Sequence, residues 1–147
     1  MIYTELTKKA LRIAFDAHKD QVDKTGLPYI FHPFHLAEQM NDEISTCVAL
    51  LHDVVEDTET TFEDMAAQGI SDEVINTLRL LTHDKAVPYM DYVRCIKDSK
   101  NAVAITVKLA DLLHNADVSR LNVIDEKTNK RLEKYRAAIR FLTDSMF

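Results

Sequence analysis

The chain has 147 residues, of which 46% are hydrophobic and 29% charged, and this globular composition argues against a disordered protein. Its net charge of −6 at pH 7 argues against a general nucleic-acid binder, because such proteins usually carry a basic surface that displaces counterions. No segment reaches the roughly 18 consecutive apolar residues that a membrane-spanning helix needs, so we expect a cytoplasmic protein with no membrane partner.

The turn residues are few, with two Gly and three Pro in the whole chain. A β-rich domain of this size would normally need more of them, so we predict an all-α fold. No linker, repeat or low-complexity tract interrupts the sequence, and we therefore expect one domain over residues 1–147. Cys47 and Cys95 lie in apolar, helix-like stretches without CxxC spacing, so both are expected to be reduced core residues.

The N-terminal third predicts two helices separated by a loop. Apolar residues at helical spacing mark the buried stripe of the first helix, at Leu6, Ala10, Ile13 and Ala17. Gly26 and Pro28 then break the pattern into a loop. Pro33 suits the first turn of a second helix that runs to about Met40. His32 precedes this proline and is expected in extended geometry at the helix mouth.

Further helices are expected along the rest of the chain. An almost wholly apolar surface over residues 44–55 predicts a helix at the centre of a bundle. Thr60 and Glu63 have capping-box spacing and predict a short helix, and Ser71 followed by two acids predicts another. Pro88 opens a further apolar segment. Longer helices are expected over residues 101–117 and 126–144, where apolar residues recur at spacings of three and four.

Polar residues directly follow the most apolar stretch of the sequence. On a continuous helix, His52 lies one turn from Glu56, and Asp53 lies one turn from Asp57. The three carboxylates repel one another, and partial burial increases that cost. A bound divalent cation would reverse the problem by favouring ionised carboxylates and a neutral imidazole. The structural alternative is the solvated end of an otherwise buried helix.

The helix predicted over residues 101–117 also carries polar groups on an apolar background. Asp111 and Asn115 share a face, and Lys108 lies on it one turn earlier. The alternative here is a cap or an internal ion pair between Lys108 and Asp111. Two imidazoles and two carboxylates become available if the helices meet, from His32, His52, Asp53 and Asp111. This set suits Mn²⁺, Fe²⁺, Zn²⁺ or a similar ion and leaves positions open for water and substrate oxygen.

These residues resemble the signature of the HD phosphohydrolase superfamily, an all-α bundle. More narrowly, the chain resembles the hydrolase domain of RelA/SpoT proteins and their small single-domain relatives, which remove the 3′-pyrophosphate of (p)ppGpp. The matching segments occur in the family's order and are Ala17-His18 with Gln21, Gly26, Pro28-Tyr29-Ile30, His32-Pro33, the run from Ala49 to Thr58 that contains HDVVEDT, Leu81-Thr82, Lys108-Leu109-Ala110-Asp111 and His114-Asn115.

The resemblance implies roles for individual residues. The metal ligands are implied to be His32, His52, Asp53 and Asp111, and the implied metal is Mn²⁺. Glu56 and Asp57 are implied to orient or deprotonate the attacking water. The metal lowers the pKa of water and neutralises phosphoryl oxygens, while a carboxylate accepts the proton. Lys24, Lys108 and Asn115 become candidate contacts to a small phosphorylated nucleotide.

The departures from the family pattern lie in nucleotide recognition. The family usually has an Arg-Lys pair ahead of the Gly-x-Pro-Tyr loop, where the Arg helps to hold guanine, but this chain has Asp23-Lys24. Leu112 stands where the family has Arg, and Asp117-Val118 stands where it has Arg-Thr. The resemblance therefore implies hydrolysis more strongly than it implies specificity for (p)ppGpp. The alternatives are an HD-type nucleoside monophosphate phosphatase and a non-catalytic nucleotide-binding regulatory protein.

Other features are open to more than one interpretation. We expect His18 and His35 to pack in the core or face solvent, and His83 to lie in a polar loop. His114 is expected to turn away from the face of Asp111, as a core residue or as an outer partner of the metal site. Residues 125–140 hold three acids and six bases, which suits a solvated helix face. The sharper alternative brings Arg131, Lys134 or Tyr135 to the mouth of the pocket, where they meet phosphate. The length leaves no room for a synthetase domain, so we expect no synthesis of (p)ppGpp, and a homo-oligomer remains open.

Overall fold

The structure, a computed structural model, describes residues 1–144. Its helices are α1 (Glu5–His18), α2 (Phe31–Glu38), α3 (Glu43–Leu51), α4 (Val54–Asp57), α5 (Phe62–Ala67), α6 (Asp72–Leu81), α7 (Tyr89–Asp98), α8 (Ala102–Asn115), the 3-10 helix η1 (Val118–Arg120) and α9 (Glu126–Thr143). Over these residues the only extended pairing is an isolated bridge between Val22 and Pro28, so the all-α prediction is confirmed. None of the described helices combines the length and apolar character that a membrane crossing requires.

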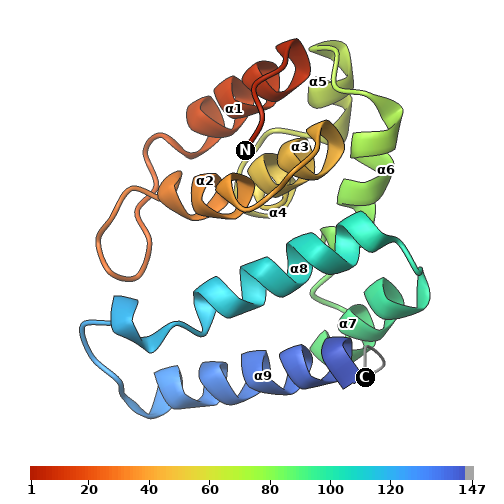
Figure 1. The fold of residues 1–147 in the computed structure, drawn as a ribbon. Coiled ribbons are helices and arrows are strands. Elements are labelled where there is room, and N and C mark those ends of the chain that lie inside the picture. The colour runs from red at the N-terminus through yellow and green to blue at the C-terminus, as the bar shows by residue number, and fades with distance from the viewer. Residues whose placement is uncertain (145–147) are drawn as a thin grey trace.

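The helix α3 forms the centre of the molecule. Every residue from Ser45 to Leu51 is buried, as the apolar sequence of this segment predicts. It begins at Asp42, whose side chain accepts a hydrogen bond of 2.8 Å from the backbone N–H of Ser45. Four helices pack against it, namely α1, α2, α6 and α8. The C-terminal helix α9 then lies alongside α8 on the side away from α1 and α2 (Figure 1). The end of α3 is therefore fixed from several directions.

Two backbone predictions around the polar residues are wrong. The helix expected over residues 44–55 ends at Leu51, and His52 and Asp53 form a turn before α4 begins. His32 is not extended but lies inside α2, one residue before Pro33. A proline near the start of a helix replaces an N–H that would lack an intrahelical partner, so this position tolerates it. The bias that proline places on its predecessor is overridden here, where both residues are buried.

Two local predictions are also corrected. The capping box at the start of α5 uses Thr61 and Asp64 rather than Thr60 and Glu63, with hydrogen bonds of 3.1 and 2.9 Å. The helix α5 therefore begins at Phe62, one residue later than a capping box of Thr60 and Glu63 would place it. Cys47 is buried as expected, but Cys95 is exposed. It lies on the outer side of α7, whose inner face is formed by Tyr92, Val93 and Ile96.

Candidate metal centre

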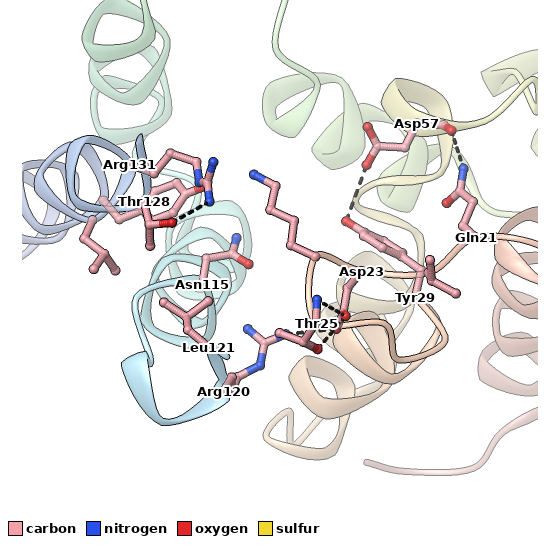
Figure 2. Close-up of a pocket in the computed structure, with 14 residues that line it drawn as sticks. Gln21, Asp23, Thr25, Tyr29, Asp57, Asn115, Arg120, Leu121, Thr128 and Arg131 are labelled. Carbon is pink, nitrogen blue, oxygen red and sulfur yellow. Dashed lines mark hydrogen bonds and ion pairs between the residues drawn. The ribbon is translucent and has the colours of Figure 1, made fainter. Parts of the chain in front are cut away.

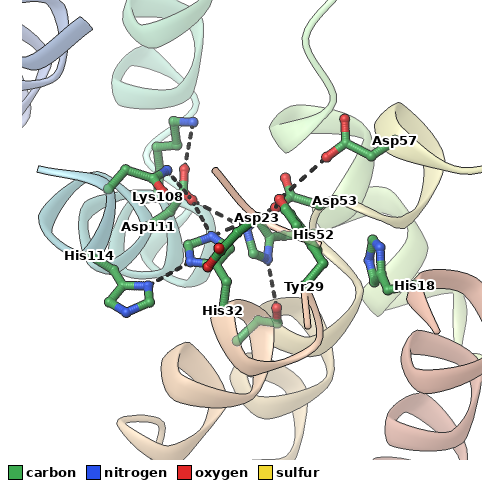
Figure 3. Close-up of polar contacts among 12 residues, drawn as sticks. His18, Asp23, Tyr29, His32, His52, Asp53, Asp57, Lys108, Asp111 and His114 are labelled. Atoms are coloured by element: carbon green, nitrogen blue, oxygen red, sulfur yellow. Dashed lines mark hydrogen bonds and ion pairs between the residues drawn. The ribbon is translucent and has the colours of Figure 1, made fainter. Parts of the chain in front are cut away.

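Four predicted ligands from three parts of the chain meet at one point. His32 comes from α2, His52 and Asp53 come from the turn after α3, and Asp111 comes from α8. One ligand atom from each residue lies within 4.8 Å of all the others. The Nε2 atom of His52 is 2.9 Å from Oδ2 of Asp53 and 3.3 Å from Oδ1 of Asp111. The break after Leu51 turns both residues toward α8 (Figure 3).

The two imidazoles are held by their other ring nitrogens. Nδ1 of His52 is 2.7 Å from the carbonyl oxygen of Ala49, and this contact directs Nε2 to the cluster. Nδ1 of His32 is 2.7 Å from Nδ1 of His114, and its Nε2 is 2.9 Å from Oδ1 of Asp111. An outer partner of this kind fixes the orientation of a metal-ligating imidazole. His114 therefore supports His32 as an outer partner, one of the two positions expected for it from the sequence.

Asp111 is contacted by two further polar side chains of α8. Lys108 contacts Oδ2 at 2.9 Å, and the side-chain amide of Asn115 donates to Oδ1 at 3.0 Å. Burial by itself raises the pKa of this carboxyl, but the Lys108 ammonium and the hydrogen bonds from both imidazoles hold the pKa well below its usual range. The ion pair between Lys108 and Asp111, given above as the structural alternative for the polar residues of this helix, is thus present.

The donor chemistry fits a divalent metal ion. Two imidazole nitrogens and two carboxylates converge, and His32, His52 and Asp111 are all buried. Without a cation, the carboxylates lower each other's tendency to ionise. Burial favours neutral His52, yet Asp53 and Asp111 raise the pKa of its imidazole well above the ordinary value. A metal ion would take the place of that proton, so this cluster can bind a divalent metal.

Glu56 and Asp57 lie beside the cluster rather than in it. The Tyr29 hydroxyl donates to Oδ2 of Asp53 at 2.5 Å and lies 3.4 Å from Oδ2 of Asp57, so it joins the ligand set to the acid pair. The carboxylate of Glu56 accepts a hydrogen bond from the backbone N–H of His83. Burial, reinforced by the charge of Asp53, raises the pKa of both acids. The sequence does not single out Tyr29 for this role, although it belongs to the matching Pro28-Tyr29-Ile30 segment.

A cavity of about 610 Å³ opens next to the acid pair. Its walls are the segment from residue 21 to 29 on one side and the end of α8, η1 and α9 on the other (Figure 2). Tyr29 and Asp57 line it, which connects the cavity with the metal cluster. Lys24 and Asn115, two predicted substrate contacts, lie in its wall, together with Arg131 and Tyr135 from α9.

Positive charge gathers at the α9 side of this cavity. Burial lowers the pKa of Lys24, and the charges of Arg131, Lys127 and Lys134 lower it further, so these cations lie near one another. The Lys134 ammonium lies 4.5 Å from the centre of the Tyr89 ring. Within residues 1–144, the ion pairs made by lysine or arginine are Lys108–Asp111 and Arg120–Asp23, which leaves the cations near Lys24 without a carboxylate partner. Such a site attracts an anion.

Comparison with known proteins identifies relatives with this architecture, although no protein-family model matches the chain. The chain is 33% identical over 141 residues to the guanosine-3′,5′-bis(diphosphate) 3′-pyrophosphohydrolase MESH1 of Xenopus tropicalis, which covers 88% of this chain and 78% of that protein. It is 32% identical over 142 residues to the guanosine-3′,5′-bis(diphosphate) 3′-pyrophosphohydrolase of Aquifex aeolicus, covering 90% of this chain and 20% of that much longer protein.

A solved structure shares the fold. It is that of a metazoan orthologue of SpoT, described as hydrolysing ppGpp and playing a role in starvation responses. The TM-score is 0.77 at 26% sequence identity, and the match covers 98% of this chain and 86% of the other. The helical HD-type bundle predicted from the sequence is therefore confirmed. Together with the MESH1 match, this shows that the chain belongs to the guanosine-3′,5′-bis(diphosphate) 3′-pyrophosphohydrolase family.

Proposed function

We propose that this chain forms a single catalytic domain that removes the 3′-pyrophosphate of (p)ppGpp in a metal-dependent hydrolysis. The observation that carries the proposal is the four-ligand cluster, which adjoins an acid pair and a cavity whose Lys24 and Arg131 have no carboxylate partner within residues 1–144. The names and the described activity of the relatives support the same chemistry. A cytoplasmic location follows as a further part of the proposal, because (p)ppGpp is an intracellular nucleotide.

The metal in this proposal is Mn²⁺, held by His32, His52, Asp53 and Asp111. A mixture of imidazole and carboxylate ligands suits a transition ion, and four protein ligands leave positions open in a six-coordinate shell. When bound, the ion supplies positive charge for the phosphoryl oxygens and lowers the pKa of water.

The acid pair supplies the base in this proposal. A carboxylate whose pKa lies nearer neutrality is a better proton acceptor at working pH, and burial moves Glu56 and Asp57 in that direction. The backbone N–H of His83 fixes one carboxylate, and the Tyr29 hydroxyl lies beside the other. One of the two takes the proton of the attacking water at a side-chain oxygen while the other keeps the water in position.

The cations of the cavity provide for the rest of a highly charged substrate. A guanosine bis(diphosphate) carries a second diphosphate that is not cleaved, and this group needs positive partners away from the metal. Lys24 and Arg131 line the cavity, the charge of Lys134 acts on Lys24 from nearby, and all three lack carboxylate partners among the described residues. We therefore assign the non-scissile phosphates to these three side chains.

Replacing Arg131 with alanine is expected to raise KM by roughly 10- to 100-fold with little change in kcat, because a charge-assisted hydrogen bond to phosphate is lost. Arg131 lines the cavity and contacts the hydroxyl of Thr128 at 3.3 Å. Steady-state kinetics with ppGpp measures the effect. Arg136→Ala is the matched control, because Arg136 is an exposed arginine on the same helix. An unchanged KM for Arg131→Ala would remove this residue from the binding site.

Adding MnCl₂ to metal-free protein is expected to raise the unfolding temperature, and to do so more strongly at pH 8 than at pH 6. The pKa of His52 is well above its ordinary value without metal, so a proton must leave before the imidazole can bind the ion. At a metal concentration of 100 times Kd the stabilisation is about 2.7 kcal/mol, or roughly 5–10 °C for a chain of this size. Thermal scans at both pH values test this, and an equal shift at both would contradict the proton exchange.

The proposal as a whole is tested by product analysis on a nucleotide panel. We expect pyrophosphate from ppGpp in the presence of MnCl₂, none without added metal, and none from the Asp53→Ala variant. Orthophosphate from nucleoside monophosphates, with ppGpp untouched, would favour the nucleoside monophosphate phosphatase. If no nucleotide were hydrolysed while ppGpp still bound, the chain would be a regulatory binding protein instead.

A further inference from the structure

An ion pair joins the two walls of the cavity. Nη2 of Arg120, at the end of η1, lies 3.5 Å from Oδ2 of Asp23 in the segment between α1 and α2. Nη1 of the same guanidinium donates to the carbonyl oxygen of His114 at 2.7 Å. Both Asp23 and Arg120 line the cavity (Figure 2). The guanidinium is thus held by its edge from both walls.

Asp23 is itself rigidly placed. Its Oδ1 atom accepts hydrogen bonds from the backbone N–H of Thr25 at 2.8 Å, from the hydroxyl of Thr25 at 2.6 Å and from the backbone N–H of Leu27 at 3.1 Å. Only Oδ2 remains for Arg120. A carboxylate with this many partners does not swing into the cavity to meet a ligand, so its effect on a ligand passes through the arginine that it orients.

The cations of the cavity wall differ in whether they are paired. The charge of Arg120 is balanced by Asp23, whereas Lys24 and Arg131 have no carboxylate partner among the described residues. Beside Arg120 lies the apolar side chain of Leu121, also in the cavity wall. Asp23 and the carbonyl oxygen of His114 occupy the edge of the guanidinium, and the Arg120 side chain is 24% exposed. The flat face of the guanidinium is therefore left for a ligand. A neutral, flat and partly apolar surface suits a planar heterocycle better than a phosphate.

We propose that Arg120 stacks on the nucleobase of the substrate and that Asp23 is its positioning residue. The inference rests on the proposed function, because it takes the ligand to be a nucleotide whose phosphates meet Lys24 and Arg131. It also accounts for the anion at position 23, since the guanidinium beside it comes from η1 on the opposite wall. In this proposal the arginine that holds the base comes from η1 and not from the segment ahead of the Gly-x-Pro-Tyr loop.

The test separates the base from the phosphates by comparing two probes, guanosine 5′-monophosphate and ribose 5-phosphate, in equilibrium binding to the manganese-loaded protein. Wild type is expected to bind the nucleotide roughly tenfold or more tightly than the sugar phosphate, because a base stacked on a planar side chain adds that much. Arg120→Lys keeps the charge beside Asp23 but lacks the flat face, so the ratio should fall to within about twofold, with ribose 5-phosphate binding unchanged.

Three further variants sharpen the result. Arg120→Ala should collapse the ratio in the same way. Arg131→Ala should weaken both probes equally and keep the ratio. Asp23→Asn can still accept the hydrogen bonds of Thr25 and Leu27 but loses the ion pair, so the ratio should fall partway. A ratio near one in wild type, undetectable binding of both probes, or a full ratio in Arg120→Lys would overturn the inference.

These readouts need no turnover, so the two proposals can fail separately. If ppGpp is not hydrolysed but the ratio depends on Arg120, the base site stands and the proposed reaction is wrong. If ppGpp is hydrolysed and the ratio is the same in wild type and Arg120→Lys, the reaction stands and the base is held elsewhere.

Discussion

Replacing Asp53 with alanine is expected to abolish metal binding and hydrolysis together. Asp53 provides one of the four converging ligand atoms, and its Oδ2 atom lies 2.9 Å from Nε2 of His52 and 3.7 Å from Nε2 of His32. Losing an outer-shell partner of a metal ligand typically costs about 10- to 100-fold in affinity or activity. Loss of a ligand itself should exceed that. Metal content after dialysis and kcat with ppGpp measure the two effects on the same sample.

The variant needs a control for folding, because Asp53 also accepts the hydrogen bond of the Tyr29 hydroxyl. Asp53→Asn keeps an oxygen for that hydrogen bond and the volume of the side chain, while it removes the negative charge that a cation needs. Asp16→Ala, at an exposed position of α1, tests whether loss of any acid has the same effect. Asp53→Asn should lose metal like Asp53→Ala, and Asp16→Ala should behave as wild type. Full metal occupancy in both Asp53 variants would exclude this residue as a ligand.

The candidate ligands can be predicted from the sequence because most of them interrupt an apolar helix. His52 and Asp53 follow the run that becomes α3, and Asp111 lies among apolar residues of α8. Buried polar residues need an explanation, and convergence on one ion supplies it for these three. His32 is different, since no periodicity distinguishes it, and it enters the ligand set through its position before Pro33 and through the resemblance.

The turn between α3 and α4 could not be predicted in this way. Residues 44–55 carry no Gly or Pro, and their local preference is helical throughout. The chain leaves the helix because distant partners hold His52 and Asp53: Nε2 of His52 contacts Asp111, 59 residues later, and Oδ2 of Asp53 accepts from Tyr29, 24 residues earlier. Interactions of this range override local propensity, and nothing in the helical pattern marks where they act.

The same limit applies to the roles of the charged residues around the cavity. Lys108 is a candidate phosphate contact in the sequence, and the folded chain places its ammonium 2.9 Å from the candidate ligand Asp111, a contact that bears on the metal site as well. When position 23 is considered alone, Asp23 replaces the arginine with which the family holds guanine, and the recognition residue is missing. Its pairing with Arg120 joins segments that lie far apart in the sequence, so only the folded molecule shows that a cation is still present beside position 23.

Glu56→Gln is expected to keep the metal and to lower kcat by about 10²- to 10⁴-fold, the range typical for loss of a general base. The glutamine oxygen can still accept from the backbone N–H of His83, so the side chain stays in place while its capacity to take a proton is removed. Metal content and KM for ppGpp should change little. The single-residue exchange thus separates proton transfer from metal binding, which Asp53→Ala cannot do.

The pH profile decides whether Glu56 or Asp57 is the base. Burial raises the pKa of both carboxyls, so each is expected to titrate above an exposed acid, and activity that depends on the ionised form should be lost as pH falls through that pKa. If Glu56 is the base, the decrease of kcat at low pH should be absent in Glu56→Gln. Asp57→Asn should keep this decrease and lose less of the rate. A fully active Glu56→Gln together with an inactive Asp57→Asn would transfer the role to Asp57. Its carboxylate, beside the Tyr29 hydroxyl and in the cavity wall, is then the proton acceptor.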